Sequence, residues 1–132
     1  MVLPPLESFC WLDIEERKKI LDYLEEFKLY AKVEVKGKTY LLKHAGIPQS
    51  ATLDNLDEYD DYDFLIAYTD YCAPALDGIT LVTGHQVTSE IDKNSRGKIY
   101  RNFNHIAIDV GAVFGISLAC LCLDTGEEFY VD

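Results

Sequence analysis

The sequence is short of basic residues. It has 12 Lys and Arg against 23 Asp and Glu, a formal net charge of −11, and no Lys or Arg at all between Lys43 and Lys93. Nucleic acids and anionic membrane surfaces are bound through clusters of basic side chains. The charge balance therefore argues against both as partners and favours an ordinary acidic globular protein.

Long apolar runs are also missing. A membrane-spanning helix needs roughly 20 consecutive apolar residues, and the sequence contains no such stretch. Residues 1–7 lack the charged start and the apolar centre of a secretory signal peptide. We therefore expect a cytoplasmic protein that has no membrane as a partner.

Cysteine is present four times, but no Cys-x-x-Cys spacing occurs. This absence argues against a zinc ribbon and against a redox-active pair. Cys10 and Cys72 are isolated in the sequence, while Cys120 and Cys122 lie two residues apart in an apolar stretch and would share one side of a strand. The sequence predicts buried, reduced thiols.

What the chain does have is a sufficient apolar content. Hydrophobic residues make up 48% of the 132 positions, enough for a packed core, and no repeat or linker interrupts them. We expect a single domain over residues 1–132.

An amphipathic helix is predicted over residues 13–27. Asp13 is its expected N-cap, and Glu16 completes the pattern of a capping box. Apolar side chains then recur on one side of the helix, which predicts that this side packs on an apolar surface. These side chains are Ile20, Leu21, Leu24 and Phe27.

Two short apolar strands each end in a histidine with a glycine close by. Residues 79–82 predict a buried strand, Gly84 allows a sharp turn, and His85 follows. Residues 39–42 predict the second strand of a hairpin that begins at residues 31–35, and this strand leads to His44. Open α/β sheets place functional residues at the carboxyl ends of strands. Each histidine is thus a candidate metal ligand, the alternative being a hydrogen-bonded structural residue.

The remaining segments complete the predicted fold. The acidic residues 54–63 lack the spacing of a calcium loop and predict a solvated loop that leads into a short helix. Four β-forming runs follow, at residues 98–103, 105–109, 117–123 and 127–131, and predict consecutive antiparallel strands. Within them, His105 is expected to be a plain strand residue, and Asp109 a structural residue or an orienting partner of His85. The predicted fold class is α+β, with a largely antiparallel sheet and helices on one face.

The order of motifs resembles the carboxyl-terminal half of the calcineurin-like metallophosphoesterases, in the branch of the bacterial serine/threonine protein phosphatases and diadenosine tetraphosphatases. The resemblance covers most of the chain. It rests on His44-Ala45-Gly46, on Gly84-His85-Gln86-Val87, on residues 97–101, on Ile108-Asp109-Val110-Gly111 and the residues to 115, and on residues 118–121, 123–124 and 128–131.

This resemblance implies one half of a four-layer αββα sandwich. The family hydrolyses phosphoesters with two divalent metal ions, expected to be Mn, Fe or Zn. His44 and His85 match the two histidines that bind the same metal ion in the family. Gln86 follows the second of them, as in the eukaryotic-type phosphatases.

The matches cover only half of the family's site. Its first half carries Asp-x-His, Gly-Asp-x-x-Asp-Arg and Gly-Asn-His-Glu motifs, and the sequence contains none of them. Tyr68 stands where the family has a phosphate-binding arginine, and Lys43 stands where an apolar residue is usual. We therefore assign no catalytic residue and expect a phosphatase by lineage that is incomplete and inactive as this chain alone.

Two hypotheses follow. In the first, the chain is half of a phosphatase, and its partner is the missing amino-terminal half, with a phosphorylated substrate only once the site is complete. In the second, it is a non-catalytic interaction or assembly module that retains the half-fold. Either way we expect association, as a homo-oligomer or with the other half, because the sheet face around Leu81, Ile106 and Ile108 would otherwise be an exposed apolar patch.

Overall fold

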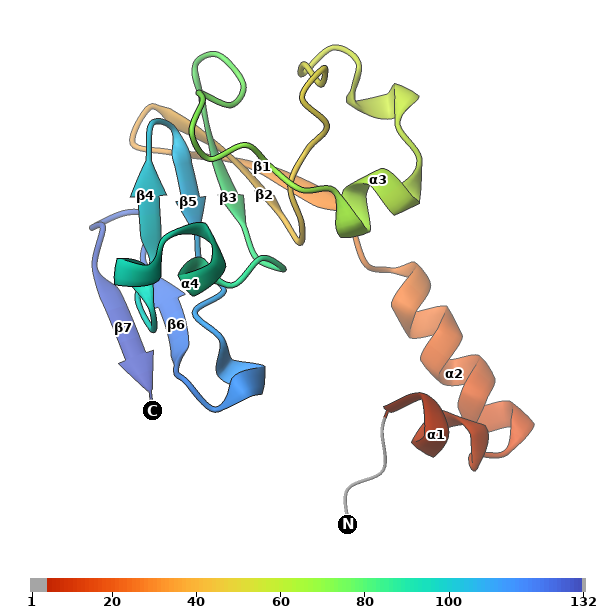
Figure 1. Ribbon diagram of the computed structural model, residues 1–132. Coiled ribbons are helices and arrows are strands. Elements are labelled where there is room, and N and C mark those ends of the chain that lie inside the picture. Colours follow the sequence, from red (N-terminus) through yellow and green to blue (C-terminus); the bar gives the residue numbers. More distant parts are fainter. Residues whose placement is uncertain (1–4, 132) are drawn as a thin grey trace.

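The computed structural model describes residues 5–131 (Figure 1). A mixed sheet of five strands forms its centre, and a separate two-stranded hairpin follows at the end of the chain. The helices are α1 (Pro5–Cys10), α2 (Ile14–Glu25), α3 (Asp61–Ile66) and α4 (Thr88–Ile91), with short 3-10 helices at Leu56–Glu58, Lys93–Ser95 and Ala112–Phe114. The strands are β1 (Tyr30–Val35), β2 (Lys38–Lys43), β3 (Ile79–Thr83), β4 (Tyr100–Asn102), β5 (His105–Ala107), β6 (Leu118–Leu121) and β7 (Glu128–Val131).

The strand order of the larger sheet is β1-β2-β3-β5-β4. The predicted α+β class is confirmed, and three of the five strand pairings are antiparallel, namely β1 with β2, β4 with β5, and β6 with β7. The centre of the sheet differs from the prediction, because β3 runs parallel to both of its neighbours. Two connections cause this: residues 44–78 return the chain to the end of the sheet where β2 began before β3 starts, and β4 returns it in the same way before β5 starts.

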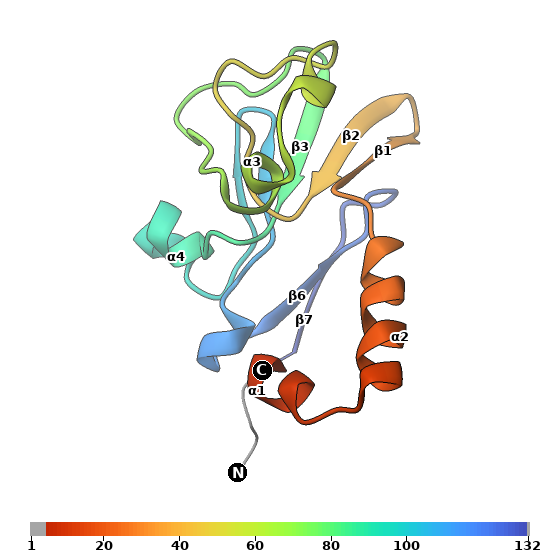
Figure 2. The ribbon, with the colours of Figure 1, turned by 90° about the vertical axis from the view of Figure 1, so that its right-hand side faces the viewer.

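One face of the sheet is covered by that connection, which includes α3 (Figure 2). Phe64 of α3 and Leu56 pack against Leu41 and Leu81, both of which are fully buried. Helix α3 begins at a capping box formed by Asp60 and Asp63, so the acidic stretch has a local structural role. The prediction of helices on one face holds for α3, whereas α1 and α2 stand away from the sheet (Figures 1 and 2).

The opposite face is covered by the β6–β7 hairpin. Val82 and Ile106 of the sheet are buried in a cluster that includes Ala119 and Leu121 of β6. The expectation of an exposed patch around Leu81, Ile106 and Ile108 is therefore wrong, because this chain covers both sides of its own sheet. Leu81 and Ile106 are buried, and Ile108 is partly buried.

Helix α2 begins after Asp13, as the sequence predicts, but its apolar side is not packed on another part of the chain as predicted. Asp13 and Glu16 form the capping box, which satisfies backbone N–H groups that the helix leaves unpaired. Against residues 5–131, however, α2 has no buried side chain. The apolar face of α2, defined here as Ile20, Leu21, Leu24 and the following Phe27, is 38–61% exposed.

The first hairpin has the turn that the sequence predicts. Lys36 and Gly37 both have positive φ, at 50° and 74°, as a two-residue turn between twisted strands requires. The prediction of buried cysteines is wrong: all four are free thiols, three are exposed, and Cys122 is partly exposed. Within residues 5–131, no helix combines the length and the apolar character that a membrane span requires.

Candidate functional site

The candidate site lies where β2 and β3 end side by side. The two strands are parallel, and their register pairs Lys43 with Thr83, so that their next residues also meet. The backbone N–H of Gly84 donates to the carbonyl oxygen of His44 at 2.8 Å. A Cβ on Gly84 would lie 3.3 Å from that oxygen, closer than such contacts usually are, so glycine suits this approach.

This arrangement brings the two predicted histidines together. The rings of His44 and His85 lie with their centroids 5.0 Å apart and their planes at 60°, and both residues are exposed. The prediction that the pair is close in space is confirmed. Neither the exposure nor the contact assigns a ligand role, which stays a prediction.

The separation fits two ligands of one metal ion. A metal at about 2.1 Å from an imidazole nitrogen lies roughly 3.2 Å from the ring centre, so ligands at 90–110° to each other have ring centres about 4.5–5.2 Å apart. The observed 5.0 Å lies within that interval. Among residues 5–131, no set of three His, Cys, Asp or Glu side chains gathers as a metal site. The separation is equally that of an edge-to-face contact between two rings, so it allows two ligands of one ion and does not by itself make a metal centre.

His85 has an unusual backbone conformation. Its φ is +65°, a left-handed value that costs a residue with a Cβ about 1 kcal/mol or more. A glycine at position 85 would adopt the same conformation without that cost. Lys36 and Phe103 also have positive φ, each in a tight turn between two strands, so the conformation of His85 marks the sharp turn after β3 and does not assign a role to its side chain.

Tyr68 completes the immediate surroundings of the pair. Its ring centroid lies 6.3 Å from that of His85, and the side chain is 73% exposed. The resemblance matches Tyr68 with the phosphate-binding arginine of the family, and the structure places this residue beside the histidines. A phenol has a hydroxyl group but no positive charge, so it gives a phosphate no ion pair.

The segment of Tyr68 is fastened to the His44-Ala45-Gly46 motif. The N–H of Gly46 donates to the carbonyl of Ala67 at 2.7 Å, and the N–H of Ile47 donates to Oγ1 of Thr69 at 3.1 Å. A Cβ on Gly46 would lie 2.6 Å from the backbone nitrogen of Thr69. Only glycine allows this close crossing, which holds Tyr68 next to the end of β2.

Lys43 stands where the family usually has an apolar residue, and the sequence alone assigns it no role. Its side chain is buried, at 8% exposure. Its Nζ donates to the carbonyl oxygen of Gly46 and lies 4.4 Å from the ring centre of Phe64. Burial lowers the pKa of Lys43 to about 8, against the opposing charge of Asp63. Lys43 thus links the end of β2 to the core beneath α3.

The other predicted polar residues have structural roles. Oδ1 of Asp109 accepts from the N–H of Gly111 at 3.0 Å, and the carbonyl of Asp109 accepts from the N–H of Thr88 at 2.8 Å. Asp109 therefore shapes the turn after β5, as one of the two predictions for it stated. His105 is buried, with Nε2 at 2.9 Å from the carbonyl oxygen of Ala73. The strand position was predicted, but this partner comes from a segment 32 residues earlier and has no signal in the sequence.

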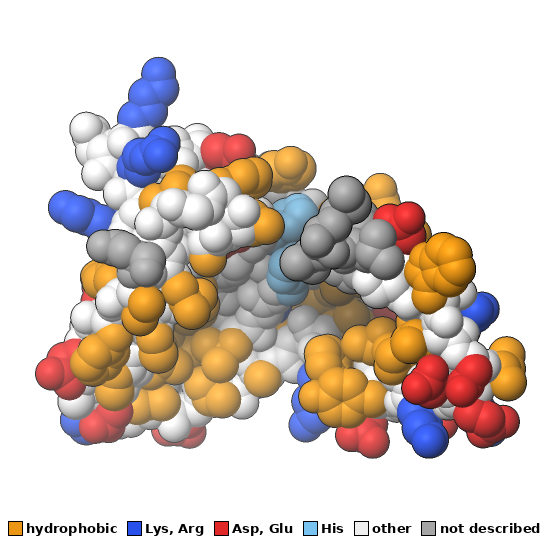
Figure 3. All heavy atoms as spheres, turned by 90° about the horizontal axis from the view of Figure 1, so that it is seen from below, with side chains coloured by type: hydrophobic (Ala, Val, Ile, Leu, Met, Phe, Trp, Pro, Cys, Tyr) orange, Lys and Arg blue, Asp and Glu red, His pale blue; other side chains and the backbone are white. Residues whose placement is uncertain are grey.

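A broad groove adjoins the pair. Figure 3 shows hydrophobic side chains on both sides of a hollow, with histidine between them; one side is formed by α1 and α2 and the other lies over the β6–β7 hairpin. A pocket of about 1060 Å³ between α2, β2 and α3 borders His44 and includes Leu24, Phe27 and Leu65 in its walls. The exposed apolar surface of the chain thus lies next to the candidate site.

The sequence matches no protein-family model and no curated protein.

Proposed function

We propose that the chain is the carboxyl-terminal half of a calcineurin-like metallophosphoesterase, and that His44 and His85 are two ligands of one of its metal ions. The observation that carries the proposal is the pair itself. Two histidines separated by 40 residues meet at the ends of adjacent parallel strands, with ring centroids 5.0 Å apart. The backbone of His85 is left-handed, with φ at +65°, a conformation in which a residue with a Cβ is strained.

The layers of the chain support the same proposal. In a four-layer αββα sandwich, each sheet has helices on its outer face and the other sheet on its inner face. Here α3 lies on one face of the five-stranded sheet and the β6–β7 hairpin on the other. The position of Tyr68 beside His85 is a further agreement, because the resemblance matches that residue with a site residue.

The proposed metal is Mn, Fe or Zn, which imidazole binds readily. When bound in a complete site, a pair of such ions supplies a hydroxide nucleophile and neutralises phosphoryl oxygens. The part of this chain is to position two imidazoles, each on a strand end that the sheet holds rigidly. Neither histidine is assigned a proton-transfer role.

Catalysis is proposed to require a second polypeptide segment. The sequence lacks the Asp-x-His, Gly-Asp-x-x-Asp-Arg and Gly-Asn-His-Glu motifs that supply the remaining ligands and the catalytic acid in the family. The apolar groove beside His44 is the place where a segment carrying them would dock, because its walls offer Leu24, Phe27 and Leu65 to an apolar partner surface.

The test is hydrolysis of a generic aryl phosphate with added Mn²⁺. The chain is assayed alone and mixed with a polypeptide that carries the three missing motifs, first sought in the coding region upstream of Met1. We expect turnover only in the mixture, and its loss when His85→Ala replaces the wild-type chain. Turnover by the wild-type chain alone that His85→Ala abolishes would refute the requirement for completion.

The second candidate is a non-catalytic assembly module that retains the half-fold. The observation that favours it is the apolar face of α2, whose four side chains are 38–61% exposed. A module of this kind would form a stable homodimer, and the mixture with the motif-bearing polypeptide would gain no activity. Solution mass measured alongside the hydrolysis assay separates the two candidates.

A further inference from the structure

The two edge strands of the five-stranded sheet, β1 and β4, differ in what lies beside them. β4 has three residues and has β7 next to it, where Arg101 donates to Glu128 at 2.9 Å (Figure 1). β1 pairs with β2 over six residues without a bulge, and it contains no Pro or Gly. α2 leaves the sheet at the start of β1 and runs away from it (Figures 1 and 2). β1 is thus an open edge of regular geometry, and such edges are templates for a further strand.

The turn between β1 and β2 decides which backbone groups of β1 face outward. Its two residues have positive φ, at 50° and 74°, as in a turn in which the carbonyl of Val35 accepts from the N–H of Lys38. Residues that bond to the neighbouring strand alternate along an antiparallel pair, so every second residue counted back from Val35 bonds to β2. The N–H and carbonyl groups of Lys32 and Glu34 therefore point to the open edge. Among residues 5–131, neither has a backbone hydrogen bond outside the sheet ladder.

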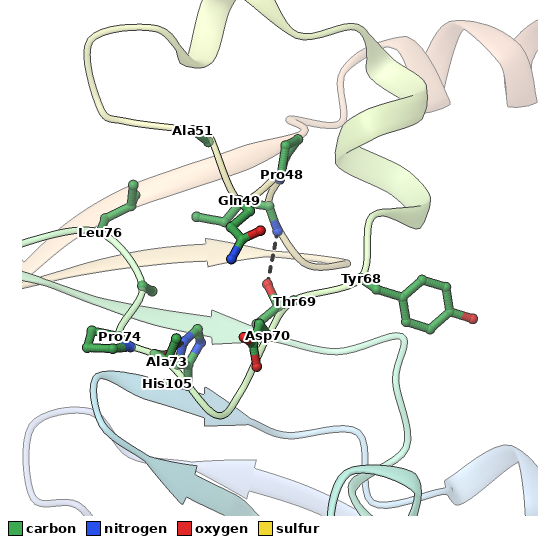
Figure 4. Close-up of a pocket in the computed structure, with 12 residues that line it drawn as sticks. Pro48, Gln49, Ala51, Tyr68, Thr69, Asp70, Ala73, Pro74, Leu76 and His105 are labelled. Atoms are coloured by element: carbon green, nitrogen blue, oxygen red, sulfur yellow. Dashed lines mark hydrogen bonds between the residues drawn. The ribbon is translucent and has the colours of Figure 1, made fainter.

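The side chains of the same two residues carry opposite charges and are exposed. They lie on the α3 side of the sheet, where the connection after β2 packs on β2 and β3. That connection is fastened to itself by the hydrogen bond from Ile47 to Thr69 (Figure 4), and it leaves Lys32 and Glu34 uncovered. The two ion pairs among residues 5–131 involve other side chains. The charges of Lys32 and Glu34 are therefore available to a partner.

Lys32, Val33 and Glu34 form a pattern that is complementary to itself. When a second copy runs antiparallel with its Val33 opposite Val33 of the first, Lys32 of each chain lies opposite Glu34 of the other. These pairs join opposite charges, and they can exchange backbone hydrogen bonds because their N–H and carbonyl groups face outward. A register centred on Lys32 or on Glu34 would set that residue against its own copy. We propose that two copies of this chain pair through β1 in the register centred on Val33, which joins their sheets into one.

The other face of β1 fits the same register. Val33 and Val35 are partly buried there, against the cluster that includes Leu121 of β6. In the paired chains Val33 meets its own copy in a pair without hydrogen bonds, the kind in which side chains come closer together. Ala31 meets Val35 of the second copy, so apolar surface is removed from water on this side. The pairing is independent of the proposed function, because neither histidine takes part in it.

Amide hydrogen exchange, measured by NMR on the full chain at concentrations up to about 1 mM, tests the pairing. The amides of Lys32 and Glu34 should exchange more slowly as the concentration rises, whereas those of Val33 and Val35, which bond to β2 in every state, should change less. Exchange at Lys32 and Glu34 that does not depend on concentration overturns the proposal. The Leu21→Ser, Leu24→Ser variant of α2 should keep this dependence, and its loss there would assign the association to α2 and overturn pairing through β1.

Charge reversal tests the register by sedimentation. Lys32→Glu and Glu34→Lys each set like charges against each other in both pairs, and each should weaken dimerisation at least about tenfold. A mixture of the two variants should associate as wild type does, because every pair between them joins opposite charges. Both residues are exposed, so the variants keep the fold. Lys19→Glu, with the same change in net charge on the polar side of α2, is the control and should dimerise normally. A mixture that stays monomeric, or unweakened dimerisation of Lys32→Glu, overturns the proposal.

Discussion

Gly84 and His44 are joined by a hydrogen bond of 2.8 Å between the N–H of one and the carbonyl oxygen of the other. This bond extends the ladder between parallel strands β2 and β3 by one step beyond their last paired residues. His44 is thereby held at the edge of the sheet, and His85 follows Gly84 directly, in the bend after β3. Groups that the backbone already holds in position lose less freedom when they bind an ion.

Replacement of Gly46 by alanine is predicted to be strongly destabilising. Its Cβ would lie 2.6 Å from the backbone nitrogen of Thr69 and 2.7 Å from the carbonyl oxygen of Ala67, and backbone atoms cannot move aside cheaply. We expect a loss of about 3 kcal/mol in the free energy of unfolding. Gly37→Ala is the control: it meets no atom within 4 Å but keeps a φ of +74°, so it should cost about 1 kcal/mol. Urea unfolding measures both, and equal losses would contradict the close crossing at Gly46.

His85→Gly is predicted to separate stability from metal binding. Glycine adopts the φ of +65° freely, so the free energy of unfolding should stay the same or rise by up to about 1 kcal/mol. Affinity for a divalent ion should fall, because one imidazole is lost. Phe103→Gly is the matched control, since Phe103 is an exposed residue with a φ of +50° outside the site; it should gain similar stability and keep the metal affinity. A marked loss of stability in His85→Gly would show that the side chain is structural.

Because the pKa of Lys43 is lowered, the free energy of unfolding is predicted to rise at alkaline pH. Burial lowers its pKa from 10.5 to about 8 in the folded chain, so between these two values the unfolded chain binds more protons than the folded one. Stability contributed by Lys43 therefore increases as the pH rises through this window, by about 3 kcal/mol in total. Urea unfolding at pH 7 and at pH 10 measures the change, with Lys43→Met as the control that removes it. The same slope in Lys43→Met would assign the effect to another group.

Helix α2 predicts self-association of the chain. Leu21 and Leu24 are 51% and 49% exposed, so a Leu21→Ser, Leu24→Ser double variant should change the stability of the monomer by no more than about 0.5 kcal/mol per site. It should nevertheless reduce association, which sedimentation detects as a mass above the 15.0 kDa of one chain. Lys19→Ser, on the polar side of α2, is the control and should associate as wild type does. A wild-type chain that stays monomeric at every concentration would contradict self-association through this face.

Local chemistry made much of the fold predictable. The capping box at Asp13 and Glu16, the turn at Lys36 and Gly37, and the strand before Gly84 were all predicted from residues that are close in sequence. Such elements depend on local hydrogen bonds and on the φ that glycine permits. The order of the strands was not predictable in this way. The parallel pairing of β2 with β3 depends on the path of a connection over residues 44–78, and that of β3 with β5 on a second connection that contains α4 and β4. Neither path leaves a periodic pattern in the sequence.

The candidate site was predictable in part for the same reason. Glycines next to strand ends identified His44 and His85, and the structure places their rings together. Burial could not be predicted as well. The apolar face of α2 has the pattern of a packed helix and yet is exposed, because periodicity shows that a face is apolar without showing what covers it. The unpaired Nδ1 of His105 likewise depends on a fold-wide contact with Ala73.

The central claim is that His44 and His85 bind one divalent ion, and Mn²⁺ titration followed by NMR tests it most directly. Paramagnetic Mn²⁺ broadens the ring signals of nearby imidazoles. We predict that the signals of His44 and His85 broaden together, at lower Mn²⁺ concentrations than that of the buried His105, and that His85→Ala protects His44 from broadening. Broadening of only one of the pair, or of His44 to the same extent in His85→Ala, would contradict the claim.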